Sequence, residues 1–331
     1  MPHTAIADLE ANQFIEGIYV VQNCQLGMSK GGKPYVKCLI ADRTGRTPAR
    51  LWNADEIRFK QLPTNGFVEI EGTTQPYQGE IQIILQEIRE AKPTNEQIEE
   101  LLPKTKYDIE KMFAGLVKAL ETIEHPALAL LAKCYLEDEA LIEKFKRAPA
   151  AMTLHHAYIG GLLEHTLSLM RLGHVVCPLY PGVNREIVML GLFLHDLGKC
   201  VELTWDAGFG YSDEGMLVGH IARGVIWLEE KAKECEAKGT KVPEPLLRVL
   251  HHIILSHHGK AEFGALKVPA TPEALAISLM DNLDAKMHMA LAVTRDDAGE
   301  AINRDGNFTE RIWALDTRMY RPDPTKLDES E

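Results

Sequence analysis

Short stretches of alternating apolar and polar residues fill the chain between residues 13 and 89. Turn clusters such as SKGGKP and DRTG separate five of them: FIEGIYVVQNCQL, YVKCLIAD, TPARLW, GFVEIEGTTQPY and EIQIILQEI. A period of two is typical of strands that bury one face. Five strands with no long helical pattern among them predict a small closed β-barrel of the OB type.

From Thr94 onward the apolar residues recur at spacings of three and four, which is the period of amphipathic helices. Pro93 marks the change, and TNEQIEELL has the pattern of a capped helix start. Long helices are predicted over residues 153–172, 185–199, 216–233, 245–258 and 271–292. After about residue 300 the chain turns polar and contains proline, which predicts a surface tail with one packed turn at residues 312–315.

The expected fold class is therefore multidomain, with a five-stranded barrel followed by an all-α domain. The predicted parts are the barrel, a helical connection packed on the next domain, the helical domain and the tail, over residues 1–92, 93–150, 151–300 and 301–331.

Composition places the chain among ordinary soluble proteins, with 45% hydrophobic and 25% charged residues among 331. The first residues, MPHTAIADLEANQF, lack the regions of a signal peptide, and no apolar run approaches the roughly 18 residues that a membrane span requires. The six cysteines form no CxxC pair, which favours reduced thiols. These features predict a cytoplasmic protein without a membrane partner.

The formal charge of −12 counts against a simple basic nucleic-acid binder, because phosphate contacts need clustered Lys and Arg. The charge is unevenly spread, since residues 12–92 hold ten Lys or Arg against nine Asp or Glu. A polyanion is therefore expected to meet the N-terminal part first, with modest and salt-sensitive affinity.

An OB barrel often binds single-stranded nucleic acid with a basic groove and aromatic side chains that stack on bases. The candidates here are basic and aromatic residues of the predicted strands and first long loop: Lys30, Lys33, Tyr35, Lys37, Arg50, Trp52 and Tyr77. Two alternatives stay open. Trp52 is equally expected to close the barrel core, and Lys30 and Lys33 could serve only to solubilise a glycine-rich loop.

A good share of the thirteen histidines lie on the inward stripes of the predicted helices, where a soluble protein normally places Leu or Val. These histidines, with two aspartates on the same helices, are His165, His195, Asp196, His220, His257, His258 and Asp281. Any one of the histidines is most simply a satisfied core histidine or a surface residue at a helix end. Together they would need a separate buried partner for each, whereas one or two metal ions would satisfy all of them.

The order H…HD…H…HH…D resembles the HD-domain metallophosphohydrolase superfamily. The segments HHAYIGGLLEHT, HDLGK, GHI, LSHHG and DNLDAK resemble the YhaM-type 3′-to-5′ exoribonucleases, a family that also places an OB barrel before its HD domain. The resemblance implies one metal held by His165, His195, Asp196 and Asp281. It implies that Asp196 bridges to a second metal held by His220, His257 and His258, although HD subfamilies differ in whether one or both adjacent histidines bind. It also places His155 and His156 near the substrate mouth.

Mixed nitrogen and oxygen ligands suit Mn or Fe better than Ca, with Mg, Co and Zn as alternatives. Two such ions can turn a bridging water into hydroxide near neutral pH and neutralise the charge of a phosphodiester. The expected catalytic residues are Asp196, as the bridge, and Lys199, whose ammonium could reach a phosphate oxygen. The alternative for Lys199 is a solvated lysine at a helix end.

The expected function is a metal-dependent phosphodiesterase that shortens single-stranded RNA from the 3′ end, with single-stranded DNA as an alternative substrate. The direction follows from the resemblance alone. Two alternatives remain: an HD phosphohydrolase of small nucleotides or cyclic dinucleotides, and a nucleic-acid-binding regulatory protein with a structural or silent metal site. A homo-oligomer is also possible, because the long helices of an acidic domain can form an interface.

Overall fold

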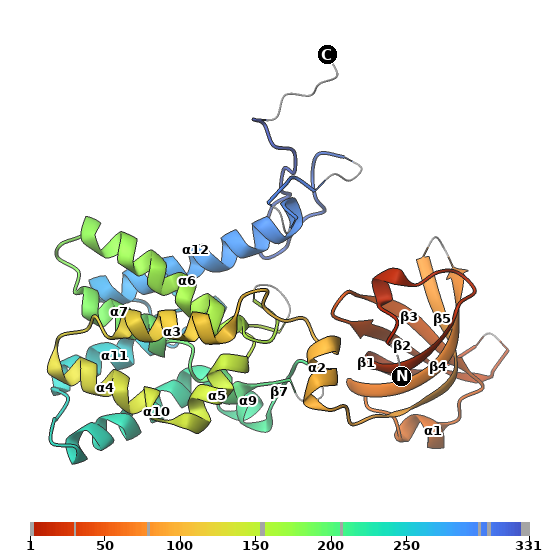
Figure 1. Ribbon diagram of the computed structural model, residues 1–331, viewed down its shortest axis with the longest axis horizontal. Coiled ribbons are helices and arrows are strands. Elements are labelled where there is room, and N and C mark those ends of the chain that lie inside the picture. The colour runs from red at the N-terminus through yellow and green to blue at the C-terminus, as the bar shows by residue number, and fades with distance from the viewer. Residues whose placement is uncertain are drawn as a thin grey trace.

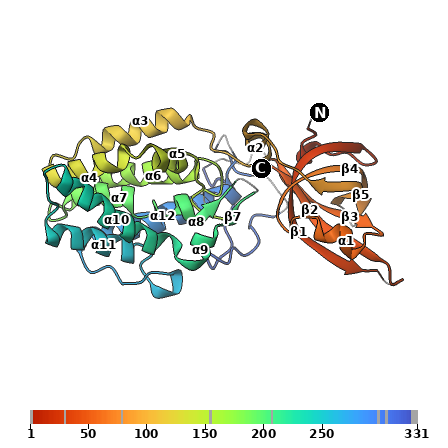
Figure 2. The same ribbon diagram turned by 90° about the horizontal axis from the view of Figure 1, so that it is seen from below.

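The computed structural model describes residues 3–29, 31–77, 80–152, 156–205, 208–296, 299–302 and 306–325. A β-barrel forms one end of the molecule and a bundle of helices the other (Figures 1 and 2). Helix α2 lies between them, and α12 leads to the C-terminal segment (Figure 1). The predicted change from strands to helices near residue 93 is confirmed.

The barrel closes in the order β1-β2-β3-β5-β4, with β3 and β5 parallel and the other pairs antiparallel. Its strands are β1 Phe14–Met28, β2 Pro34–Asp42, β3 Gly45–Trp52, β4 Gly66–Tyr77 and β5 Glu80–Glu90, with the short helix α1 Glu56–Lys60 after β3. Alternate residues such as Val36, Ile70 and Ile83 are buried inside. The five-stranded OB-type barrel predicted from alternation is confirmed.

The helical part begins at α2, which Thr94 caps through a capping box with Gln97, as the sequence pattern predicts. The helices are α2 Asn95–Leu101, α3 Ile109–Leu120, α4 Pro126–Leu136, α5 Glu139–Arg147, α6 Gly161–Val176, α7 Arg185–Leu194, α8 Lys199–Glu202, α9 Asp213–Leu217, α10 Gly219–Ala237, α11 Glu244–Ser256 and α12 Pro272–Thr294. A short hairpin, β6 Leu203–Thr204 and β7 Gly210–Tyr211, follows α8. Helices α3 to α8 and α10 to α12 share one apolar core.

Two predicted helix limits were wrong at positions that shape the site. The helix predicted over 153–172 begins only at Gly161, where a Cβ would lie 2.0 Å from the carbonyl oxygen of His156. The helix predicted over 185–199 ends at Leu194, and the chain turns before α8 begins. A Cβ on Gly198 would lie 2.1 Å from the carbonyl oxygen of His220. Glycine at these two positions lets the backbone approach a histidine segment closely.

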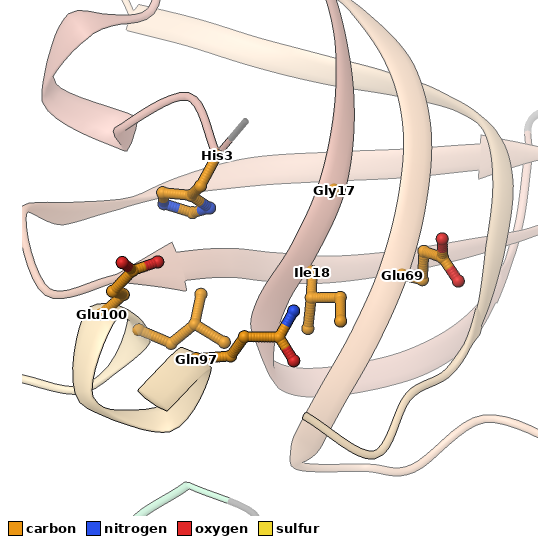
Figure 3. A pocket seen from close by; sticks show the side chains of 7 residues that line it. His3, Gly17, Ile18, Glu69, Gln97 and Glu100 are labelled. Carbon is orange, nitrogen blue, oxygen red and sulfur yellow. The ribbon is translucent and has the colours of Figure 1, made fainter. Parts of the chain in front are cut away.

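A small apolar cluster joins the two ends of the molecule. It is formed by barrel residues, α2 residues and one residue before α6: Val20, Ala41, Phe67, Ile98, Leu101, Leu102 and Ile159. Trp205 and Phe209, beside the β6–β7 hairpin, pack against it. A cleft of about 200 Å³ opens between β1 and α2 beside this cluster, where His3, Ile18 and Gln97 face one another (Figure 3).

In the C-terminal segment, Phe308 pairs with Tyr320 and Ile312 with Thr317. The turn predicted at residues 312–315 therefore lies at the tip of a small hairpin-like loop. None of the helices in the described ranges is long and apolar enough to cross a membrane.

Candidate metal centre and nucleic-acid surface

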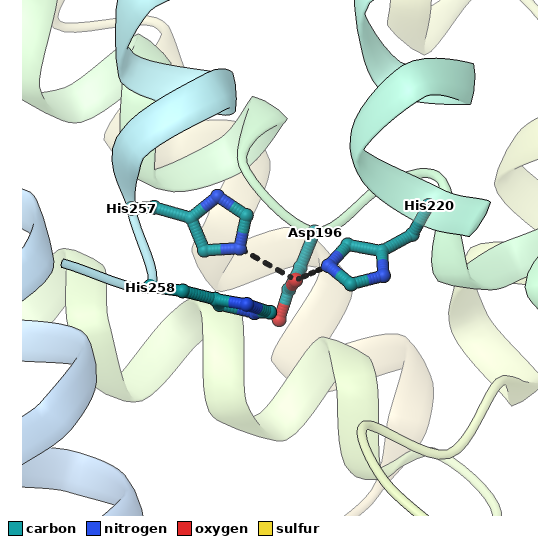
Figure 4. A group of neighbouring side chains, drawn as sticks. All are labelled: Asp196, His220, His257 and His258. Atoms are coloured by element: carbon teal, nitrogen blue, oxygen red, sulfur yellow. Dashed lines mark ion pairs between the residues drawn. The ribbon is translucent and has the colours of Figure 1, made fainter. Parts of the chain in front are cut away.

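His195 and Asp196 occupy the turn that follows α7, and both are almost fully buried. Figure 4 shows His220 from the start of α10, with His257 and His258 from the end of α11, converging on Asp196. Nε2 of His220 lies 3.5 Å, and Nε2 of His257 3.4 Å, from Oδ1 of Asp196. One ligand atom from each of these four residues lies within 4.8 Å of the others.

A second group of ligand atoms gathers at the other oxygen of Asp196. Nε2 of His195 lies 3.4 Å, and Nε2 of His165 3.8 Å, from Oδ2 of Asp196. Asp281, on α12, brings its Oδ1 to 3.2 Å from Nε2 of His165. The seven predicted metal ligands thus come together, and Asp196 presents a different oxygen to each group.

Backbone carbonyl groups orient two of these histidines. Nδ1 of His195 lies 2.8 Å from the carbonyl oxygen of Leu192, and Nδ1 of His257 lies 2.8 Å from that of Ile254. A carbonyl oxygen only accepts, so Nδ1 carries a proton in both rings and Nε2 is the nitrogen that faces Asp196.

Carboxylates orient two others. Nδ1 of His220 lies 2.8 Å from Oε2 of Glu202, and Nδ1 of His165 lies 2.9 Å from Oδ2 of Asp284. A carboxylate on the far nitrogen of a histidine fixes the ring and makes Nε2 a better metal ligand. Each group of ligand atoms therefore contains one histidine held by the backbone and one held by a carboxylate.

The buried ligand atoms fit a divalent cation. Among the described residues, Nε2 of His195, His220 and His257 and Oδ1 of Asp196 make no hydrogen bond. In His195, whose pKa burial lowers to about 4, a lone pair on Nε2 faces Oδ2 of Asp196 at 3.4 Å, which is repulsive unless a positive charge lies between them. A cation coordinated by both atoms removes that repulsion.

The ionisation of the histidines agrees with this fit. Burial lowers the pKa of His195 to about 4 and that of His258 to about 3, so both rings are neutral at pH 7, as metal ligation requires. Burial also opposes the charged form of His165, but hydrogen bonds with Asp281 and Asp284 outweigh it and raise the pKa to about 9. The proton on His165 supplies the positive charge beside Asp281 and Asp284 that a bound cation would supply instead.

Lys199 is not a solvated lysine, so that alternative is wrong. Its Nζ donates to Oδ2 of Asp196 at 2.7 Å, and its side chain is only 13% exposed. Burial lowers the pKa of Lys199, but the adjacent charge of Asp196 outweighs it and raises the pKa overall. Burial likewise disfavours the charged carboxylate, yet Lys199 holds the pKa of Asp196 well below its usual range.

Sequence reasoning missed the carboxylates that orient the histidines. Asp284 lies one turn after Asp281 on α12, accepts a hydrogen bond from Ser168 and contacts His156 at 3.1 Å. Its spacing from Asp281 within DNLDAK was the available signal. Glu202 precedes His220 by a hairpin and a short helix, and no periodicity connects the two. His155 lies outside the described residues.

On the barrel, Arg50 lies among three aromatic rings. Its guanidinium carbon is 5.3 Å from the ring centre of Tyr77, 5.6 Å from that of Trp52 and 6.0 Å from that of Tyr35. The rings of Tyr35 and Trp52 are 5.1 Å apart. Trp52 is 43% exposed and Tyr77 44%, so Trp52 does not close the barrel core. We call these four residues the Arg50 cluster.

Lys37 adjoins the Arg50 cluster, because it is exposed and stands opposite Arg50 in the register of β2 and β3. Lys33 is exposed in the β1–β2 connection, and Lys30 lies outside the described residues. Five of the seven residues predicted to bind nucleic acid thus lie on one surface of β2, β3 and β4.

A closed OB-type barrel joined to a helical domain with a buried His and Asp cluster defines an HD-domain phosphohydrolase with a barrel of the nucleic-acid-binding type. The sequence matches the HD domain family over residues 162–286 and the family of OB-fold nucleic acid binding domains over residues 20–91. The 3′-5′ exoribonuclease YhaM of Geobacillus sp. (strain WCH70) is 32% identical over 319 residues, covering 96% of this chain and 94% of the relative. The chain belongs to this YhaM family.

Solved structures of each kind of domain also show similarity. The second OB-fold domain of replication protein A from Methanococcus maripaludis is 17% identical, with a TM-score of 0.23, covering 28% of this chain and 98% of that one. The HD domain of phosphodiesterase PgpH from L. monocytogenes is 19% identical, with a TM-score of 0.26, covering 50% of this chain and 74% of that one. The family assignment rests on the sequence match over almost the whole chain.

Proposed function

We propose that this chain is a metal-dependent exoribonuclease that shortens single-stranded RNA from its 3′ end. In this proposal the barrel, residues 1–92, holds the strand and the helical domain, residues 151–300, cuts it. The observation that carries the proposal is the arrangement around Asp196, whose two oxygens each face a separate group of oriented histidines.

The proposed ligand sets divide at Asp196. One ion would be held by His165, His195, Asp196 and Asp281, and the other by Asp196, His220, His257 and His258. Both sets mix imidazole nitrogen with carboxylate oxygen, which favours Mn or Fe. Backbone carbonyls and the carboxylates of Glu202 and Asp284 hold four of the rings in place before any ion binds.

When bound, the two ions would supply charge to stabilise the phosphodiester and to activate the attacking water. The chain's own residues set up this chemistry. With both ions bound, Asp196 would compensate their charges and would no longer depend on Lys199 for a counter-charge. The ammonium of Lys199, 2.7 Å from Oδ2 of Asp196, is then available to a phosphate oxygen of the substrate.

The Arg50 cluster is the proposed contact for the single strand. A half-buried guanidinium among three aromatic rings offers phosphate binding and base stacking at the same place, which is how OB barrels hold single strands without reading their sequence. Lys33 and Lys37 extend its positive charge. A surface of this kind accepts single-stranded DNA as well as RNA. We propose that the reaction takes place in the cytoplasm.

The test is digestion of one single-stranded RNA labelled at either its 5′ or its 3′ end, by protein loaded with Mn. Hydrolysis from the 3′ end releases the 3′ label at once as a short product, while the 5′-labelled strand shortens progressively. Cyclic dinucleotides and free nucleotides are offered in parallel. Turnover of these small molecules with intact RNA would contradict the proposal, and binding without turnover of any substrate would indicate a binding protein.

A further inference from the structure

Five large apolar side chains stand at four-residue intervals along α12 and remain exposed: Leu275, Leu279, Leu283, Met287 and Leu291. Each is 48–59% exposed. Four residues are little more than one helical turn, so these side chains form a continuous row, which we call the α12 ridge. From Leu275 to Leu291 the ridge is about 24 Å long.

The α12 ridge is not explained by packing within the chain. The inward-facing residues of α12 include Ile277 and Met280, which are buried, and Asp281 and Asp284, which contact His165 of the metal centre. This inner side already packs on α6, α7 and α11. A single exposed leucine is ordinary, but a contiguous apolar row on a soluble protein marks an interaction surface.

Charge is almost absent from this face of α12. Of the helix residues that are exposed, Lys286 alone is charged. A helix face that meets water normally carries several charged residues. The chain as a whole has a net charge of −12, so two copies repel each other over most of their surfaces. The α12 ridge is a place where two copies can meet without opposing carboxylates.

We propose that the α12 ridge binds the same ridge of a second copy, in a two-fold symmetric dimer with the helices antiparallel. An isologous contact uses the same surface patch on both subunits, so one apolar row can serve as its own partner. The symmetry places Leu283 against its own counterpart on the axis. Leu279 then faces Met287 of the second copy, and Leu275 faces Leu291.

The exposed area of the α12 ridge suits such a contact. The hollow of about 310 Å³ beside Met287 and Leu291 is also lined by Glu164 and Asp284, so it is polar and lies outside the apolar contact. The five ridge residues expose roughly 500 Å² per copy, a large part of the ~800 Å² that each partner buries in a stable interface. The sides of α12 and α6 supply the rest.

The position of Leu283 on the axis gives a sharp experiment. Leu283→Glu sets two carboxylates against each other, and Leu283→Lys sets two ammonium groups against each other, so each variant alone should associate about 100-fold more weakly or worse. Mixed in equal amounts, the two variants place Glu against Lys and should associate again. Particle mass is measured by sedimentation without substrate, so the result is independent of nuclease activity.

The expected wild-type particle contains two chains, or a larger even number. Ile57→Glu, an equally drastic change at an exposed position on the barrel helix α1, should leave the mass unchanged. Circular dichroism and thermal melting establish that each variant is folded. The proposal is overturned by a monomeric wild type, by unchanged mass in folded Leu283→Glu, or by mixed variants that stay apart.

Discussion

Two buried aspartates, Asp42 in the barrel and Asp196 in the helical part, differ in how their oxygens are satisfied. Asp42 is held by the segment that precedes β1 and by the turn between β2 and β3. Its Oδ2 accepts from the backbone N–H of Ile6 and pairs with His3 at 2.7 Å, and its Oδ1 accepts from the backbone and hydroxyl of Thr44. Both oxygens of this carboxylate are satisfied by the protein, so Asp42 stabilises the fold and needs no bound ligand.

Around Asp196 the protein supplies one cation, Lys199, on Oδ2, while Oδ1 makes no hydrogen bond among the described residues. Histidine nitrogens surround both oxygens at distances too long for hydrogen bonds. Leaving buried polar atoms unsatisfied costs stability, so such an arrangement is retained where binding requires it. The comparison separates a structural carboxylate from a functional one without reference to any relative.

The strongest test of this contrast is Asp196→Asn. The amide keeps the size of the side chain but removes the charge that two cations share, so turnover should fall by about a thousandfold or more. Metal analysis of the purified variant should show that at least one ion is lost, while circular dichroism stays unchanged. Normal metal content together with normal turnover would contradict the bridging role.

Lys199→Ala asks whether the ion pair of Asp196 is merely structural. If the ammonium acts on the phosphate, turnover should fall about 100-fold while both ions stay bound, and Lys199→Arg should restore little. The matched control is Lys146→Ala, because Lys146 is as buried as Lys199 but pairs with Glu110 and Glu143 far from the site. Equal turnover in the Lys199 and Lys146 variants would show that Lys199 has only a structural role.

Glu202→Gln tests the carboxylate that orients His220. The amide can still accept from Nδ1 but carries no charge, so the affinity of the second ion should fall about 10- to 100-fold. Glu229→Gln is the control, because Glu229 pairs with His251 at 3.1 Å outside the metal centre. Titration with Mn, followed by electron paramagnetic resonance, counts the bound ions in each variant. If Glu202→Gln binds two ions with wild-type affinity, Glu202 has no role in metal binding.

The barrel and the metal-facing histidines could be predicted because each leaves a periodic signal. Strands alternate, and a histidine such as His165 is conspicuous on an apolar helix stripe. The orienting groups leave no such signal. Glu202 meets His220 through a hairpin fold, and the partners of His195 and His257 are backbone carbonyls, which every residue possesses. Helix ends such as Leu194 were misplaced because the break depends on Gly198 meeting the backbone of His220.

Arg50→Ala tests the proposed nucleic-acid contact on the surface of the barrel. Its guanidinium lies among three aromatic rings, two of them exposed, so its loss should weaken binding of single-stranded RNA about tenfold and reduce the salt slope by about one. Arg58→Ala removes a barrel arginine that already pairs with Glu87 and should change binding little. Fluorescence anisotropy at several salt concentrations measures both quantities. Equal effects of the two changes would argue against a specific strand site at Arg50.

Asp42→Asn should have the smallest effect on activity, because it changes only the stability of the barrel. Burial raises the pKa of Asp42, but hydrogen bonds from His3, Thr44 and Ile6 outweigh it and lower the pKa from 3.8 to about 2. A carboxyl with a lower pKa in the folded state adds stability above its unfolded value and loses it as pH falls through the folded one. The wild type should therefore lose about 1–2 kcal/mol between pH 4 and pH 2 through this group, and the variant should lack that contribution at pH 7. Urea unfolding of both proteins at pH 2, pH 4 and pH 7 measures the difference in their free energy of unfolding. Turnover of the variant at low temperature should be unchanged. A large loss of turnover in a folded Asp42→Asn would show that the two aspartates do not divide into structural and functional roles.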